Sequence, residues 1–185
     1  MKIEIISGSS RETSVTNRLA LHLEKVIKEK TEHDVNIIDV REHFLPELQR
    51  VFTTIEATPE EYRDLAKRMF QADGFILVSP EYNGSFSAAM KNLLDHFPKQ
   101  HHKVFGIVTA SPGALGGIRA AIQLQQLIFA LFGIGSPYML ITPHIEKKFD
   151  EKGNLLDDSF AKSVDTFVNE YLWLAERVIQ ETVSH

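Results

Sequence analysis

Five apolar segments of strand length alternate along the chain with longer segments of helical period. The apolar segments lie near residues 2–7, 35–40, 74–79, 103–110 and 137–142. The amphipathic segments lie near residues 14–30, 59–72, 86–96, 115–132 and 157–182. Parallel neighbouring strands need a crossover of a dozen or more residues, usually a helix. The alternation therefore predicts an α/β fold with a mostly parallel sheet and helices on both faces.

The number and spacing of the strands favour one particular sheet order. They suit a doubly wound, five-stranded parallel sheet of flavodoxin-like order 2-1-3-4-5. In this order the segment 35–40, which contains Asn36 and Asp39, is an edge strand. Glu4 is at odds with a central first strand, and we expect it to reach solvent near the strand's start. A chain of 185 residues without a visible linker is expected to form a single domain, 1–185.

Composition argues against several classes of function. A net charge of −5 argues against a basic face for nucleic acid, and the absence of cysteine excludes disulfides, thiolate metal sites and a cysteine nucleophile. No apolar run reaches the ~18 residues of a membrane span, and the chain enters its first strand at once, so we expect a cytoplasmic protein. His101 and His102 have no neighbouring carboxylate cluster, and no metal site is expected.

The run Ser79-Pro80-Glu81-Tyr82-Asn83-Gly84-Ser85 directly follows the third strand. Proline fixes its own φ and has no N–H to donate, while asparagine and glycine tolerate tight turns. Ligands of open parallel sheets bind at the carboxyl ends of the strands. We therefore expect this run to hold a flat polar ligand with its backbone.

The loop after the first strand is rich in small and hydroxylated residues. Its sequence is Ser7-Gly8-Ser9-Ser10-Arg11-Glu12-Thr13-Ser14-Val15-Thr16-Asn17, and a helix begins within it. Backbone N–H groups, a helix amino terminus and an arginine together favour an anion. An ordinary capped loop is the other interpretation. Because neither a G-x-G-x-x-G nor a P-loop lysine is present, a monophosphate fits better than a dinucleotide or a triphosphate.

A third loop, Thr109-Ala110-Ser111-Pro112-Gly113-Ala114-Leu115-Gly116-Gly117, follows the fourth strand. Taken alone it is typical of a flexible turn before a helix. The first, third and fourth strands are neighbours in the expected order, however, so the loops that follow them lie on one rim of the sheet. Their combination predicts a binding site at that rim.

These motifs, with Lys91-Asn92, Asp95 and Arg119, resemble those of the NADPH-dependent FMN reductase family, a flavodoxin-like group that includes quinone, chromate and azo-dye reductases. The similarity extends over nearly the whole chain, although Phe86-Ser87-Ala88 replaces the common Ile-Pro-Gly. The resemblance implies an FMN site. Its phosphate ligands would be Ser9, Arg11, Ser14 and Asn17, with Thr16 substituting for one contact. Its ring contacts would be Pro80, Glu81, Tyr82, Asn83 and Gly84, with Ser111, Gly113 and Gly116 across from them.

The function that follows is an FMN-dependent NAD(P)H oxidoreductase. Hydride would pass from NADPH or NADH through FMN to a small acceptor such as a flavin, quinone, azo compound or oxidised metal ion. We assign no catalytic side chain, because the cofactor carries the chemistry. A flavodoxin-like electron carrier reduced by a partner protein is one alternative, and a binding or regulatory protein that kept the fold and lost the flavin is another. The segment 115–132 is apolar on more than one face, which predicts a homodimer or homotetramer, the usual states of the relatives.

Overall fold

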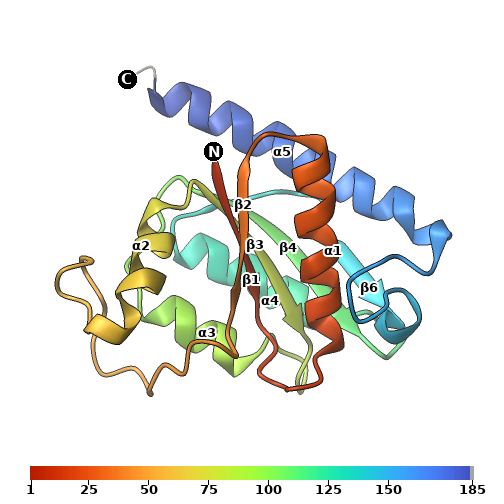
Figure 1. The fold of residues 1–185 in the computed structure, drawn as a ribbon, viewed down its shortest axis with the longest axis horizontal. Coiled ribbons are helices and arrows are strands. Elements are labelled where there is room, and N and C mark those ends of the chain that lie inside the picture. The colour runs from red at the N-terminus through yellow and green to blue at the C-terminus, as the bar shows by residue number, and fades with distance from the viewer. Residues whose placement is uncertain (184–185) are drawn as a thin grey trace.

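A computed structural model describes residues 1–183 of the chain (Figure 1). Its strands are β1 Lys2–Ser7, β2 Asp34–Asp39, β3 Gly74–Pro80, β4 Val104–Ser111, β5 Ile134–Gly135 and β6 Leu140–Pro143. Its α-helices are α1 Val15–Lys30, α2 Arg63–Gln71, α3 Ala88–Asp95, α4 Ile118–Ala130 and α5 Ala161–Val183. Short 3₁₀ turns lie at Glu60–Tyr62, Ile145–Lys147 and Asp158–Phe160. None of the described helices is long and apolar enough to cross a membrane.

The sheet has the order β2-β1-β3-β4-β5, and all its pairings are parallel. The flavodoxin-like order expected from the sequence is therefore confirmed. The expected strand 137–142 is instead two short strands, β5 and β6, which both pair with β4. Pro137 lies between them and has no N–H to donate, which explains why the ladder is interrupted there.

Each face of the sheet carries its own apolar core. On one face, α1 and α5 pack through residues such as Leu23 and Phe167. On the other face, α2, α3 and α4 pack through residues such as Met69, Leu94 and Leu124 (Figure 1). Helices on both faces are as the sequence predicted. This sandwich fixes the carboxyl ends of β1, β3 and β4, from which the candidate site is built.

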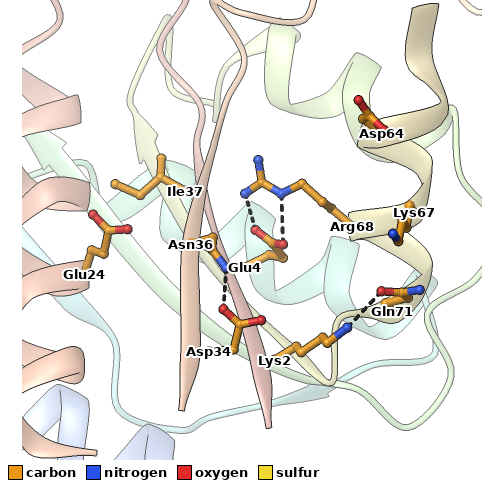
Figure 2. A pocket seen from close by; sticks show the side chains of 10 residues that line it. All are labelled: Lys2, Glu4, Glu24, Asp34, Asn36, Ile37, Asp64, Lys67, Arg68 and Gln71. Carbon is orange, nitrogen blue, oxygen red and sulfur yellow. Dashed lines mark hydrogen bonds and ion pairs between the residues drawn. The ribbon is translucent and has the colours of Figure 1, made fainter. Parts of the chain in front are cut away.

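The expectation for Glu4 was wrong. Glu4 is only 5% exposed, and its carboxylate accepts a hydrogen bond of 3.0 Å from Nε of Arg68 on α2 (Figure 2). A central strand tolerates this carboxylate because the opposing helix supplies a cation that pairs with it in two places. The residue that pairs with Glu4 lies 64 positions away, so the sequence around Glu4 contains no sign of it.

Helix α2 begins later than expected. The sequence predicted a start at Pro59 behind a Thr58 cap, but the α-helix starts at Arg63 after a 3₁₀ turn. The Thr58 hydroxyl donates instead to the Thr54 carbonyl at 2.7 Å. The hydroxyl therefore closes a turn in the preceding loop and does not cap the helix.

Candidate cofactor site

Three loops meet at the carboxyl edge of the sheet. Ser7 of β1 pairs with Val78 of β3, and Pro80 of β3 pairs with Ala110 of β4, so the three strands end side by side. The chain leaves β1 toward β2 on one side and later returns to β3 on the other. A crevice at such a reversal of strand order is where doubly wound sheets bind ligands.

The base of the first loop is fixed against β3 and α3. The Gly8 N–H donates to the Val78 carbonyl at 2.9 Å, and the Gly8 carbonyl accepts a hydrogen bond from the Ser87 hydroxyl. A Cβ on Gly8 would lie 2.5 Å from Cε of Met90. Ser87 is also the N-cap of α3, with its hydroxyl accepting from the Met90 N–H. A side chain at Gly8 would therefore have to displace the end of Met90, and Ser87 ties two of the loops together.

The rest of the first loop presents unused hydrogen-bond donors. Ser14 caps α1 by accepting from the Asn17 N–H at 3.2 Å, and its own hydroxyl proton stays available. Within the described chain, the backbone N–H groups of residues 9–13 have no hydrogen-bond partner. They lie just before the amino end of a helix, where the dipole favours negative charge. The donor set is that of an anion cradle.

Arg11 and Tyr82 join the first loop to the second. The Arg11 guanidinium lies 4.7 Å above the centre of the Tyr82 ring, and the buried Ser9 hydroxyl lies 3.2 Å from the Tyr82 hydroxyl. Arg11 forms no ion pair with any other residue that the structure describes. An exposed guanidinium held on an aromatic ring is free to pair with a ligand phosphate.

A cavity of about 250 Å³ lies between the three loops. It brings together many of the predicted site residues with four that were not predicted. The predicted ones are Ser9, Arg11, Ser14, Thr16, Pro80, Glu81 and Tyr82, and the others are Thr13, Val15, Ala110 and Pro112. Asn17 lines a neighbouring hollow, and its side-chain oxygen accepts a hydrogen bond from Ser7 at 2.9 Å. The tertiary structure therefore assembles the predicted phosphate loop and the start of the second loop around one space.

The second loop ends in a tight turn. Tyr82 and Ser85 exchange two backbone hydrogen bonds of 2.8 and 3.0 Å. Between them Asn83 and Gly84 have φ values of 51° and 79°. Two successive positive φ angles define a type I′ turn, for which Asn-Gly is the favoured pair. The turn presents the Asn83 and Gly84 N–H groups, which have no partner in the described chain.

The Glu81 carboxylate is occupied by hydrogen bonds within the protein. Its carboxylate accepts hydrogen bonds from the Arg119 and Ala120 N–H groups at 3.1 and 3.4 Å, and from Nη1 of Arg119 at 3.3 Å. Helix α4 begins after Gly117, which has no side chain to cap it. Glu81 supplies that cap from another loop, so its backbone is the part left to contact a ligand.

The third loop is ordered by internal hydrogen bonds. The Gly113 N–H donates to the Ser111 hydroxyl at 3.1 Å, and the Thr109 hydroxyl donates to the Gly116 carbonyl at 2.9 Å. Gly116 has φ +60°, and a Cβ there would lie 2.7 Å from the Pro143 nitrogen. Part of the glycine content is therefore required by packing against β6. The interpretation as a merely flexible turn does not fit these contacts.

A residue outside the motifs braces the cradle. The Arg41 guanidinium pairs with the buried Asp39 carboxylate and donates from Nη1 to the Glu12 carbonyl at 2.9 Å. Hydrogen bonds to Asp39 raise the pKa of Arg41. The arginine thus ties the end of β2 to the first loop. Arg41 and Asp39 were not predicted as part of the site, because the contact from Arg41 to the Glu12 carbonyl spans 29 positions and no local motif indicates it.

Comparison with known proteins identifies the family. The family model of NADPH-dependent FMN reductases matches residues 1–142. The chain is 31% identical over 178 residues to an FMN-dependent NADPH-azoreductase of Staphylococcus aureus, covering 92% of this chain and 93% of that protein. The chain belongs to the NADPH-dependent FMN reductase family. The resemblance inferred from the motifs is confirmed, and with it an enzyme that depends on FMN and uses NAD(P)H as co-substrate.

Solved structures agree on the fold. The flavoenzyme NAD(P)H:(acceptor) oxidoreductase FerB of Paracoccus denitrificans superposes with a TM-score of 0.78 at 22% identity, covering 95% of this chain and 97% of that one. A flavodoxin mutant from Pseudomonas aeruginosa superposes with a TM-score of 0.58 at 16% identity, covering 92% of this chain and 99% of that one. At these identities the similarity establishes the shared architecture.

The residues present fit a flavin mononucleotide. The cradle of unpaired N–H groups, the Ser14 hydroxyl and the unpaired Arg11 suit a phosphate dianion. The tip of the Tyr82–Ser85 turn suits the hydrogen-bonding edge of a flat ring. Both features lie on the same rim, as one elongated cofactor requires.

A larger hollow, of about 630 Å³, lies at the opposite end of the sheet (Figure 2). Its side chains carry both signs of charge and are largely paired with each other. Lys2 donates to Gln71 at 2.8 Å, Asn36 donates to Asp34 at 2.8 Å, and Arg68 pairs with Glu4. Since its polar groups already serve the fold and it lies by the amino ends of β1 and β2, we place no cofactor there.

Proposed function

We propose that the three loops bind FMN and that the enzyme passes hydride equivalents from NAD(P)H to a small conjugated acceptor. The observation that carries the proposal is the convergence of unpaired donors in residues 9–13, the unpaired Arg11 and the Tyr82–Ser85 turn on one rim. When bound, FMN supplies the two-electron chemistry that no side chain of the site can perform.

Each loop then has one task. The first loop holds the phosphate end of FMN through Ser9, Arg11, Ser14, Thr16 and Asn17. The second group, Pro80, Glu81, Tyr82, Asn83 and Gly84, lines the ring from one side, while Ser111, Gly113 and Gly116 face it from the other. Donors fixed in place favour the electron-rich reduced form, because charge that develops there is stabilised without reorganisation. Overall, NAD(P)H, a proton and the acceptor yield NAD(P)⁺ and the two-electron-reduced acceptor.

The acceptor we favour is a planar conjugated molecule such as an azo compound or a quinone. Support comes from the azoreductase among the relatives and from the half-buried Tyr82, an aromatic residue that lines the cavity. An anaerobic experiment tests the function directly. Purified protein should be yellow, NADPH alone should bleach it, and an azo dye or quinone should restore the colour. A yellow protein that only a partner reductase can bleach would refute the proposal in favour of an electron carrier.

We further propose that the enzyme is a homodimer formed through α4. On this helix Ile122 and Phe129 are 49% and 74% exposed, and Phe132 just beyond it is 58% exposed. Arg119 is the one charged residue of the helix and is paired with Glu81, so the exposed face of α4 itself carries little net charge. A two-fold axis brings the same patch of each copy together, which suits a self-complementary apolar face.

Light scattering with size-exclusion chromatography tests the dimer. The wild type should elute as a dimer at micromolar concentration, and Phe129→Glu should elute as a folded monomer. A monomeric wild type would refute this part of the proposal alone.

We also propose that residues 1–185 act as one FMN-binding domain in the cytoplasm. Both cores share one sheet, and a chain without cysteine needs no oxidising compartment to form disulfides; residues 184 and 185 lie outside the described chain.

A further inference from the structure

The Tyr82–Ser85 turn is held from outside by helix α4. A two-residue turn closed by its own two hydrogen bonds is marginally stable in water, so its position depends on its surroundings. Glu81, at the start of the turn, binds the amino end of α4 through the Arg119 and Ala120 N–H groups. The other end of the turn must be held by a separate contact.

Gln123 makes that contact. Its Oε1 accepts a hydrogen bond of 2.6 Å from the Ser85 hydroxyl, and its Nε2 donates at 3.1 Å to the Gly84 carbonyl. Both ends of one amide group are thus used on two consecutive residues of the turn. Gln123 is itself exposed, so ordering this long side chain gives up rotamer freedom that only these bonds offset.

The two contacts act on the position of the turn rather than on the stability of the core. Gly84, Ser85 and Gln123 are members of neither apolar core. The bond to the Gly84 carbonyl restricts rotation of the peptide plane next to the free Asn83 and Gly84 N–H groups. Donors that are held in place stabilise developing charge better than donors that must reorient.

We propose that Gln123 is a positioning residue that tunes the affinity and reduction potential of the bound flavin by fixing the Gly84–Ser85 end of the turn. The inference rests on the proposed function, because it assumes that the ring lies against this turn. Gln123 does not touch the reacting atoms. It acts through the turn, so its removal should weaken binding of reduced FMN more than binding of oxidised FMN.

The experiment compares Gln123→Ala and Ser85→Ala with the matched control Gln126→Ala in the FMN-loaded enzyme. Gln126 is an exposed glutamine on the same helix with no side-chain hydrogen bond in the described chain. Removing the Gln123 side chain should weaken the binding of reduced FMN about tenfold more than the binding of oxidised FMN. This difference makes the two-electron midpoint potential about 30 mV more negative. Gln126→Ala should match the wild type in potential, and every variant should unfold cooperatively, with a melting temperature changed only by its altered FMN affinity.

The double variant sharpens the test. Because Gln123 and Ser85 share one bond, their effects on the potential should be less than additive. Gln123→Glu keeps an acceptor for Ser85 but sets a negative charge against the Gly84 carbonyl, so its potential should be at least as negative as that of Gln123→Ala. A wild type that binds no FMN would refute the proposed function. If the wild type binds FMN, two results would refute this inference alone. One is a midpoint potential of Gln123→Ala equal to that of the wild type, and the other is an equal shift in the potential of Gln126→Ala.

Discussion

Gly116→Ala should destabilise the protein, whereas Gly113→Ala, in the same loop, should leave its stability almost unchanged. At Gly116 the backbone has φ +60°, and a Cβ would lie 2.7 Å from the Pro143 nitrogen and 2.8 Å from Cγ2 of Ile141. At Gly113 a Cβ would meet only the Ser111 hydroxyl oxygen, at an ordinary 3.5 Å. The sequence predicted both glycines as cofactor contacts, yet only Gly116 is required by the packing of the protein itself.

The magnitude follows from two contributions at Gly116. A non-glycine residue in the left-handed region costs about 1–2 kcal/mol. Forcing a methyl group against a backbone nitrogen, which cannot rotate away, costs a further ~1–3 kcal/mol. We therefore expect Gly116→Ala to lower the free energy of unfolding by about 3 kcal/mol. For a chain of this size that corresponds to a fall in Tm of about 6–12 °C.

Gly113→Ala is the internal control. Its Cβ has room, so the change in stability should stay within about 0.5 kcal/mol. Thermal unfolding followed by circular dichroism and FMN titration by fluorescence quenching measure both effects. Gly116→Ala should also weaken FMN binding, because the third loop must shift away from β6. A Gly116→Ala protein that melts within one or two degrees of Gly113→Ala would refute the reasoning.

Three further predictions concern single charged residues. Arg11→Ala should weaken FMN binding about tenfold to a hundredfold, since hydrogen bonds to charged groups contribute about 1.5–3 kcal/mol, and should flatten its salt dependence in fluorescence titrations; unchanged affinity would place the phosphate elsewhere. Arg68→Met should destabilise the fold by about 2–4 kcal/mol in urea unfolding by leaving the Glu4 carboxylate buried and unpaired, and Glu4→Leu in the same chain should restore much of it. Burial lowers the pKa of Lys103 to about 8, and a lysine whose folded pKa lies below its unfolded value binds fewer protons in the native state. Stability should therefore rise between about pH 8 and 10.5 in the wild type, an increase that Lys103→Met should lack; equal pH profiles would contradict it.

Local sequence patterns sufficed for the elements and for the order of the sheet. Apolar strands such as Gly74–Pro80 and amphipathic helices such as Val15–Lys30 are patterned by near neighbours, and Asn83-Gly84 encodes its own turn. The sequence mispredicted the start of α2 and the extent of the last strand, and in each case a single residue explains the difference. Thr58 bonds to Thr54 instead of capping α2, and Pro137 interrupts the last strand.

The cofactor loops were visible in the sequence because glycine, proline and hydroxylated residues concentrate after three strands, and doubly wound order puts those strand ends together. How the loops are held was decided by tertiary structure alone. Glu81 caps α4, Gln123 holds Gly84, and Arg68 pairs with Glu4, each across 38 or more positions. These contacts join side chains that are distant in the sequence and adjacent only in the fold, so the sequence near either residue does not indicate its partner. Residue type and local period thus determine what can bind at the rim, and the packing of α4 and α2 on the sheet determines what is left free to bind it.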